Sequence, residues 1–170
     1  MSNKEGAPTI EAGTVDDLPS IVAIYNHSLA TSHAIFDTQP TTIDGRRGWL
    51  AGFAASGPHR LLVARGATGV LGYASSGRYR EHEAFRETVE FSISLDSPAR
   101  GQGIGTLLYS ALFDVLAHEP VHVVLAGIAL PNDASVALHR RFGFTDVGVF
   151  QEYATKNGTY LSSVWMQRLL

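Results

Sequence analysis

Three glycines lie within five positions of the chain, at Gly101, Gly103 and Gly105, directly after Arg100 and directly before a stretch with helical periodicity. Glycine lets the backbone approach a ligand closely, and successive N–H groups at the beginning of a helix bind anions. With one fixed arginine beside it, the segment RGQGIG (residues 100–105) is predicted to bind a pyrophosphate. The alternative is a tight strand-to-helix turn that binds no ligand.

Two other phosphate-binding loops do not fit this segment. A Rossmann loop has Gly-x-Gly-x-x-Gly after the first strand and an acidic residue about 20 positions later. Here the spacing is Gly-x-Gly-x-Gly in the middle of the chain, and the next apolar run, residues 121–130, ends without an acid. A P-loop needs Gly-Lys-Ser or Gly-Lys-Thr, whereas Lys4 and Lys156, the two lysines of the chain, lie far from the glycines.

The run EFSISL, residues 90–95, comes just before the glycine segment and alternates polar with apolar side chains. Alternate side chains of a strand lie on opposite faces. The two faces of this strand are therefore Glu90, Ser92 and Ser94 on one side, and Phe91, Ile93 and Leu95 on the other. The apolar face fits a core and the polar face fits a wet cleft, so Glu90 is a candidate general base. A solvated strand glutamate is the alternative.

Asn132 and His139 are seven residues apart, which places them two turns apart on nearly the same face of a short helix. Asn132 can cap this helix. His139 precedes Arg140 and Arg141, so it is either a surface residue or a group that takes part in catalysis or substrate binding.

These residues must be positioned by elements that periodicity and turn signals predict. Strands are expected at 9–13, 60–79 as a hairpin, 87–95, 121–130, 145–153 and 158–170, and helices at 16–30, 42–55, 104–116 and 134–142. Asp16 or Asp17 is expected to cap the first helix. Because this order mixes an antiparallel meander with helical crossovers, we expect an α+β fold. Its mixed, mostly antiparallel twisted sheet is flanked by helices.

Composition narrows the class of protein further. The 170 residues, 45% hydrophobic and 17% charged with a net charge of -3, are typical of one globular domain, here residues 9–170 after a disordered tail at 1–8. Arginines and glutamates alternate near residues 78–87, so no basic stripe for nucleic acid is predicted. Without cysteine, there is no disulfide, thiolate metal site or cysteine nucleophile. No signal peptide or membrane span is recognisable, and a cytoplasmic location with no metal is expected.

The glycine segment and the later LPNDASVALHRRFGF (residues 130–144) together resemble the acetyl-CoA site of the GCN5-related N-acetyltransferases (GNAT). Residues 9–170 resemble the branch containing phosphinothricin and methionine sulfoximine N-acetyltransferases. The stretches that carry this closer resemblance are IYNH at 24–27, IFDTQP at 35–40, TVE at 88–90 and VWMQRL near the end. The resemblance implies the acyl-CoA N-acyltransferase fold, acetyl-CoA as co-substrate and a homodimer.

The resemblance also implies roles for individual residues. Glu90 corresponds to the general base, acting through a water, and His139 stands where many members of the superfamily have a tyrosine that protonates the departing sulfur. Where the strand splays from its neighbour, the N–H groups of Ile93 and Leu95 would bind the thioester oxygen and pantetheine. The remaining residues expected to bind acetyl-CoA are Arg100, Gly101, Gln102, Gly103, Ile104, Gly105, Thr106 and Asn132.

The acceptor side departs from the resembled branch. The residues expected to bind the acceptor are Phe36, Arg80, His82 and Phe85, with a core phenylalanine as the alternative for Phe36. The branch tends to have other residue types at five positions of this chain, namely His82, Phe85, Ser94, Tyr160 and Ser162. Because histidine lacks the fork that binds a carboxylate, the expected substitutes for an arginine at His82 are Arg78, Arg80 and Arg86.

The sequence therefore predicts an acetyl-CoA-dependent N-acetyltransferase that acts by direct attack on a small primary amine. The leading acceptor is an amino acid or an analogue such as phosphinothricin or methionine sulfoximine. Two alternatives stay open: acetylation of a peptide or protein amine, and a CoA-binding sensor without turnover.

Overall fold

The computed structural model describes residues 7–170, so residues 1–6 of the predicted tail lie outside the described part. One sheet in the order β1-β2-β3-β4-β5-β7-β6 forms the centre. Its strands are β1 (Thr9–Ala12), β2 (Arg60–Gly66), β3 (Gly69–Arg78), β4 (Thr88–Leu95), β5 (Val123–Leu130), β6 (Thr145–Lys156) and β7 (Thr159–Leu169). The helices are α1 (Leu18–Thr31), α2 (Ile43–Leu50), α3 (Ile104–Leu116) and α4 (Asp133–Arg141). Among the strands of residues 7–170, only β4 and β5 pair in parallel, so the predicted mixed, mostly antiparallel α+β fold is confirmed.

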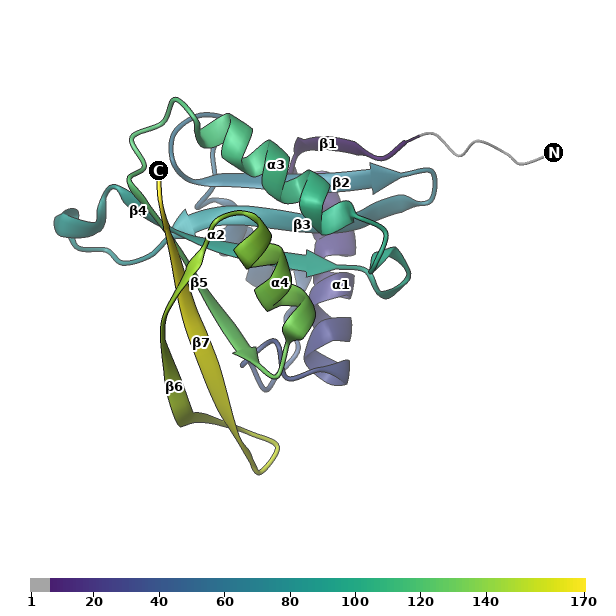
Figure 1. Ribbon diagram of the computed structural model, residues 1–170. Coiled ribbons are helices and arrows are strands. Elements are labelled where there is room, and N and C mark those ends of the chain that lie inside the picture. The colour runs from purple at the N-terminus through teal and green to yellow at the C-terminus, as the bar shows by residue number, and fades with distance from the viewer. Residues whose placement is uncertain (1–6) are drawn as a thin grey trace.

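The helices lie on both faces of the sheet (Figure 1). Alternation along β2 supplies both cores: Leu62 and Ala64 pack in the cluster that α3 covers, while Leu61 and Val63 pack against α1. Residues from β3 divide in the same way, because successive side chains of a strand point to opposite faces. Because the β2–β3 hairpin is buried on both faces, both of its strands are apolar runs in the sequence.

The helical spacing of the apolar residues along 104–116, Leu107 among them, predicts an apolar stripe, and helix α3 presents such a stripe to the larger core. Leu108 and Leu112 are buried, but Leu107 is exposed. The buried face also includes Tyr109, which lies one residue beyond Leu108. The stripe is therefore rotated toward Tyr109, and Leu107 falls at its margin.

Two predictions for the helix ends need correction. Asp17 is the N-cap residue of α1, as expected, but its side chain does not cap this helix; the buried carboxylate instead accepts from the Thr14 N–H at 2.8 Å and pairs with Arg65 at 2.7 Å. Helix α2 ends at Leu50 rather than at residue 55, because the backbone turns back after it and Ala54 pairs with the carbonyl of His59.

Strand β6 also differs from the prediction, since it continues to Lys156 instead of ending at 153. Its register with β7 shifts between Phe150 and Ala154. Glu152 within this irregular stretch has φ of 50°. Between Phe150 and Ala154, β6 contains two more residues than the facing part of β7. This irregularity and the polar residues nearby interrupt the alternation of polar and apolar side chains, so the sequence did not predict that the strand continues.

The feature that positions the site is a break in the sheet between β4 and β5. These strands pair only over Thr88–Glu90 and Val123–Leu125. Beyond Glu90, β4 continues to pair with β3 as far as Leu95, and β5 continues to pair with β7 as far as Leu130. The two strands diverge from this point toward their ends (Figure 1). Backbone groups of β4 that face the gap therefore have no strand partner, as expected from the resemblance.

A buried lysine at the end of β6, an edge strand of the sheet, forms hydrogen bonds with the end of α1. Lys156 Nζ donates to the carbonyls of Leu29, Ser32 and Ile35 at 2.9, 3.2 and 2.8 Å. The residue is only 7% exposed. Its ammonium group therefore satisfies carbonyls of the last turn of α1 and of the following loop, where a cation is favoured.

Replacing this lysine should destabilise the fold. In Lys156→Met the three carbonyls lose their charged donor, and we expect the free energy of unfolding to fall by about 2–3 kcal/mol. Urea denaturation measures this loss, with Thr155→Met, an exposed neighbour on β6, as the control. Equal unfolding midpoints for the two variants would contradict the anchoring role.

Candidate functional site

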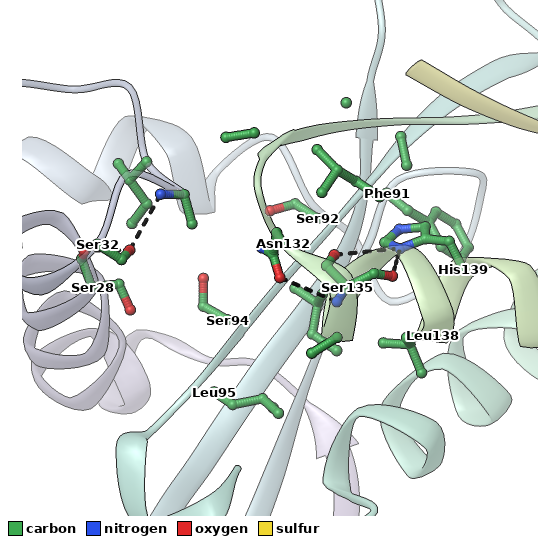
Figure 2. A pocket seen from close by; sticks show the side chains of 18 of the residues that line it. Ser28, Ser32, Phe91, Ser92, Ser94, Leu95, Asn132, Ser135, Leu138 and His139 are labelled. Atoms are coloured by element: carbon green, nitrogen blue, oxygen red, sulfur yellow. Dashed lines mark hydrogen bonds between the residues drawn. The ribbon is translucent and has the colours of Figure 1, made fainter. Parts of the chain in front are cut away.

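A cavity of about 640 Å³ lies where β4 and β5 separate. In Figure 2, Ser28 of α1 and Ser32, which directly follows α1, stand on one side, and Ser135, Leu138 and His139 of α4 stand on the other. Side chains of β4 lie between these two helices (Figure 2). Three elements that are far apart in the sequence therefore enclose one space.

The structure brings together seven of the residues predicted for catalysis or acetyl-CoA binding. Those that line the cavity are Glu90, Ile93, Leu95, Arg100, Gly101, Asn132 and His139. The other members of the glycine segment, Gln102, Gly103, Ile104, Gly105 and Thr106, do not line it but form the turn into α3 next to it. The candidate base and the predicted pyrophosphate loop thus belong to one site.

The glycine segment has the geometry that anion binding requires. Gly101 and Gly103 have φ of 73° and 80°, a conformation that favours glycine, and a Cβ on either would meet no atom within 4 Å. The first helical hydrogen bond runs from the Leu107 N–H to the Gly103 carbonyl, so the N–H groups before it have no partner within the helix. These free donors and the open space around the loop fit a pyrophosphate.

Two side chains shape the loop around these donors. Gln102 Nε2 donates to the Pro98 carbonyl at 2.6 Å, which closes the loop on itself. Arg100 lines the cavity and its Nη2 donates to Ser28 Oγ at 3.4 Å, so its charge lies toward α1. Gly105 serves packing instead, because a Cβ there would lie 3.2 Å from Leu138 of α4.

Glu90 is the last residue of β4 that pairs with β5, directly before the break. It pairs with Gly77 on one side and Leu125 on the other, and its half-buried side chain lines the cavity. Burial raises the pKa of the Glu90 carboxyl above its ordinary value of 4.5. A carboxylate of raised pKa is a better proton acceptor, so this position suits a general base.

His139 is 2% exposed, so the surface interpretation of this residue was wrong. Its Nδ1 lies 2.7 Å from the Ser135 carbonyl, which can only accept, so Nδ1 carries the hydrogen. Its Nε2 therefore accepts from the hydroxyl of the buried Tyr109 at 2.8 Å. Burial lowers the pKa of His139, which favours this neutral form. Both ring nitrogens are thus engaged within the protein, and the pair joins α4 to α3.

Asn132 caps α4, as its position in the sequence suggested, with Oδ1 accepting from the Ser135 N–H at 3.2 Å. This bond is drawn in Figure 2, where the Asn132 side chain lies near Ser135 at the wall of the cavity. Its amide nitrogen remains available to a ligand, since the cap uses only the oxygen.

The four residues expected to bind the acceptor, Phe36, Arg80, His82 and Phe85, do not line the cavity. Phe36 packs edge-on against Tyr153, with ring centroids 5.8 Å apart. Arg80 lies over the Tyr79 ring at 5.1 Å, and His82 and Phe85 belong to the same aromatic group. Of the positions that depart from the resembled branch, Ser94 lines the cavity, whereas Tyr160 and Ser162 do not.

One end of the cavity is formed by residues that the sequence did not single out for binding or catalysis. It is lined there by Tyr25 of α1, Arg46 and Trp49 of α2, and Tyr73 of β3. Tyr25 belongs to IYNH (24–27), one of the stretches that carry the family resemblance, but no motif marks the other three residues. Arg46 and Trp49 stand three residues apart in a predicted helix and Tyr73 stands in a predicted strand, and both patterns are also typical of ordinary packing.

Neither a membrane span nor a metal cluster is found among residues 7–170. No helix there is long and apolar enough to cross a membrane. No group of three or more histidine or acidic side chains in that range could hold a metal ion.

Comparison with known proteins places this fold and site in a family. A model of the acetyltransferase (GNAT) family matches residues 21–144, so the chain belongs to the GNAT family, and the resemblance drawn from its motifs is confirmed. The chain is 43% identical over 163 residues to a phosphinothricin N-acetyltransferase of Streptomyces coelicolor, covering 95% of each chain. It is 39% identical to an L-methionine sulfoximine/L-methionine sulfone acetyltransferase of Pseudomonas aeruginosa, covering 94% of this chain and 92% of the relative.

Solved structures of acetyltransferases have the same fold as this chain. The chain matches yncA, described as a putative acetyltransferase from Salmonella typhimurium with its cofactor acetyl-CoA, at a TM-score of 0.90 and 34% identity, covering 97% of this chain and 95% of that one. It also matches a GNAT superfamily phosphinothricin acetyltransferase from Sinorhizobium meliloti in complex with acetyl-CoA. There the TM-score is 0.89 and the identity 31%, with 97% of this chain and 89% of the other covered. The protein is thus an N-acetyltransferase by family.

The hydrogen-bonded pair predicts a stability effect at His139. In His139→Ala the buried Tyr109 hydroxyl loses its acceptor and a cavity forms, so the free energy of unfolding should fall by about 2–4 kcal/mol. Thermal and urea unfolding measure this, with the exposed Arg141→Ala on the same helix as the control. A large loss of turnover with unchanged stability would instead indicate direct proton donation by His139.

Proposed function

We propose that the protein transfers the acetyl group of acetyl-CoA to the primary amine of a small molecule, with an amino acid or a close analogue as acceptor. The observation that carries this proposal is the position of Glu90, in one cavity with the glycine segment and the divergent end of β4. The named relatives, which act on phosphinothricin and on methionine sulfoximine or sulfone, support this acceptor class.

Different residues of the chain would bind the pyrophosphate, the pantetheine arm and the thioester oxygen of acetyl-CoA. The N–H groups at the beginning of α3 and the guanidinium of Arg100 would hold the pyrophosphate. The N–H groups of Ile93 and Leu95, on the strand that leaves its neighbour, would bind the pantetheine arm and the thioester oxygen, with the Asn132 amide across the cavity. Acetyl-CoA supplies the acetyl group as a thioester, and the products are the N-acetylated amine and CoA.

Glu90 would take up the proton that the amine must lose in order to attack. A primary amine is mainly protonated at neutral pH and is not nucleophilic in that state. Partial burial raises the pKa of the Glu90 carboxyl, and this makes it a stronger base than a solvated glutamate. We assign His139 to positioning Tyr109 and α4, because its two nitrogens are already bonded.

Removing the carboxylate tests this role. We expect Glu90→Gln to lower kcat at neutral pH by about 100-fold or more, while the affinity for CoA stays unchanged. In the parent enzyme kcat/KM should rise with pH through the raised pKa of Glu90, and the variant should lack this rise. The control is Glu87→Gln, an exposed glutamate just before β4. Thiol release equal to that of the parent would rule out Glu90 as the base.

Stability gives the same variant a second readout. Because the folded pKa of Glu90 is raised, ionisation costs the native state free energy as pH rises from about 4.5 through the folded pKa. Glutamine does not ionise. Glu90→Gln should therefore match the parent in acid and become the more stable protein above the folded pKa of Glu90, as measured by thermal unfolding across pH.

We also propose a homodimer formed through β6. This strand is at the edge of the sheet and exposes a row of large apolar side chains: Val147, Val149, Phe150 and Tyr153. An exposed apolar edge strand favours association with another chain. A cytoplasmic location stays a prediction from composition.

A charge in this row should disrupt the dimer. Phe150→Asp should sediment as a monomer at concentrations at which the parent is dimeric, because the carboxylate would be buried without a partner. Val15→Asp, which replaces an exposed apolar residue elsewhere, is the control. Equal sedimentation of the parent and Phe150→Asp would exclude β6 as the interface.

A further inference from the structure

The end of the cavity formed by α1, α2 and β3 contains a second arginine. Arg46 of α2 lines the same cavity as Glu90, together with Tyr25, Trp49 and Tyr73. Its Cζ lies 3.9 Å from the centroid of the Tyr25 ring and 4.8 Å from that of Trp49. Two aromatic faces therefore fix the plane of the guanidinium group, which reduces the entropy lost when it binds a ligand.

This guanidinium has no anionic partner within the part of the chain that is described. Arg46 forms no ion pair among residues 7–170, and its Nε is buried without a hydrogen-bond acceptor. Its neighbour Arg47, in contrast, pairs with Asp44 at 3.0 Å on the exposed side of α2. A buried donor without an acceptor costs free energy, so an anion entering the cavity would gain by supplying one.

The surroundings of Arg46 favour an anion over a neutral group. The Tyr25 hydroxyl donates to the Asp37 carboxylate and is therefore already used within the protein. Burial raises the pKa of Tyr73, which keeps its hydroxyl protonated and neutral. Ser94, opposite Tyr73 in the β3–β4 ladder, adds a small polar side chain to the same cavity. The planar fork of Arg46, with the hydroxyl groups of Tyr73 and Ser94 in the same cavity, matches a carboxylate, which can accept two parallel N–H bonds.

The arginines that the sequence offered for this purpose are directed elsewhere. Arg78 pairs with Glu81 at 2.7 Å, and Arg86 pairs with Glu87 at 3.1 Å. Arg80 lies over the ring of Tyr79. None of the three lines the cavity. The acceptor's anionic group therefore needs a cation from another element.

We propose that Arg46 is the specificity-determining residue that binds the carboxylate of the acceptor, leaving the acceptor's amine within the cavity that contains Glu90. The amine end of this proposal rests on the proposed acetyl transfer, whereas the contact between Arg46 and the carboxylate does not require turnover. The enzyme then selects amines that carry an anionic group over amines of the same shape without one.

A pair of acceptors that differ only in the carboxylate tests this assignment. These are L-methionine sulfone and its decarboxylated analogue, 3-(methylsulfonyl)propan-1-amine. In Arg46→Met the KM for the amino acid should rise about 10- to 100-fold, which is the loss of one charged bidentate contact. Values for the decarboxylated amine and for acetyl-CoA should stay close to those of the parent.

Two further variants separate binding from folding. Arg46→Lys keeps the charge and loses the fork, so it should restore only part of the affinity for the amino acid. Arg47→Met removes an exposed arginine on the same helix and should change neither KM. Far-UV circular dichroism and thermal unfolding verify that each variant folds. An equal loss for both acceptors in Arg46→Met, or no loss for either, would overturn the proposal.

Binding without turnover distinguishes this proposal from the proposed function. Trp49, one of the two tryptophans of the chain, lies beside Arg46, so titration with L-methionine sulfone or phosphinothricin should change the tryptophan fluorescence. If the parent binds these amino acids but acetylates no amine, and Arg46→Met abolishes binding, the carboxylate site stands and the acetyl transfer fails. If neither compound binds to the parent, the assignment of Arg46 is wrong.

Discussion

The structure depends on the interruption of one parallel strand pair. β4 and β5 share a ladder over only three residue pairs, and the ladder ends at Glu90. Everything proposed for the site uses this break. The break leaves backbone donors of β4 without a strand partner and places the Glu90 carboxylate at the last position of β4 that pairs with β5. It also leaves the space that α1 and α4 enclose. A continuous ladder would satisfy the same donors within the sheet and would leave no room for an extended ligand.

The charged side chains of the cavity do not neutralise one another through ion pairs. Arg100 lies by the glycine segment, Arg46 lies between aromatic rings, and neither has an ion-pair partner among the described residues. Glu90 lies in the same cavity, and burial raises its pKa. Groups left unpaired in a half-buried site cost stability, and they supply binding and catalysis when a ligand of the complementary charge enters.

The walls of the site are held by buried polar contacts that the chemistry does not use. Tyr109 and His139 join α3 to α4 at the wall of the cavity, and Lys156 joins the end of β6 to carbonyls of the last turn of α1 and of the loop after it. Each contact links elements far apart in the sequence, and each would leave buried groups unsatisfied if it were cut. Such contacts fix the distance across the cavity, and a small change in that distance is costly in an enzyme that aligns two substrates.

The sequence alone determined the element order and the mixed sheet, because these follow from local periodicity and turn signals. It also predicted a donor site and Glu90 as the base, from three glycines before a helix and from alternation along residues 90–95. It also pointed to the GNAT family, since two motifs occurred at the right spacing. It did not determine that His139 is buried against Tyr109, because that contact joins two helices 30 residues apart. Only tertiary structure placed Arg46 in the cavity and kept Arg78, Arg80 and Arg86 out of its lining. The environment of an arginine depends on which elements pack beside it, and single-sequence periodicity contains no information about packing between distant elements.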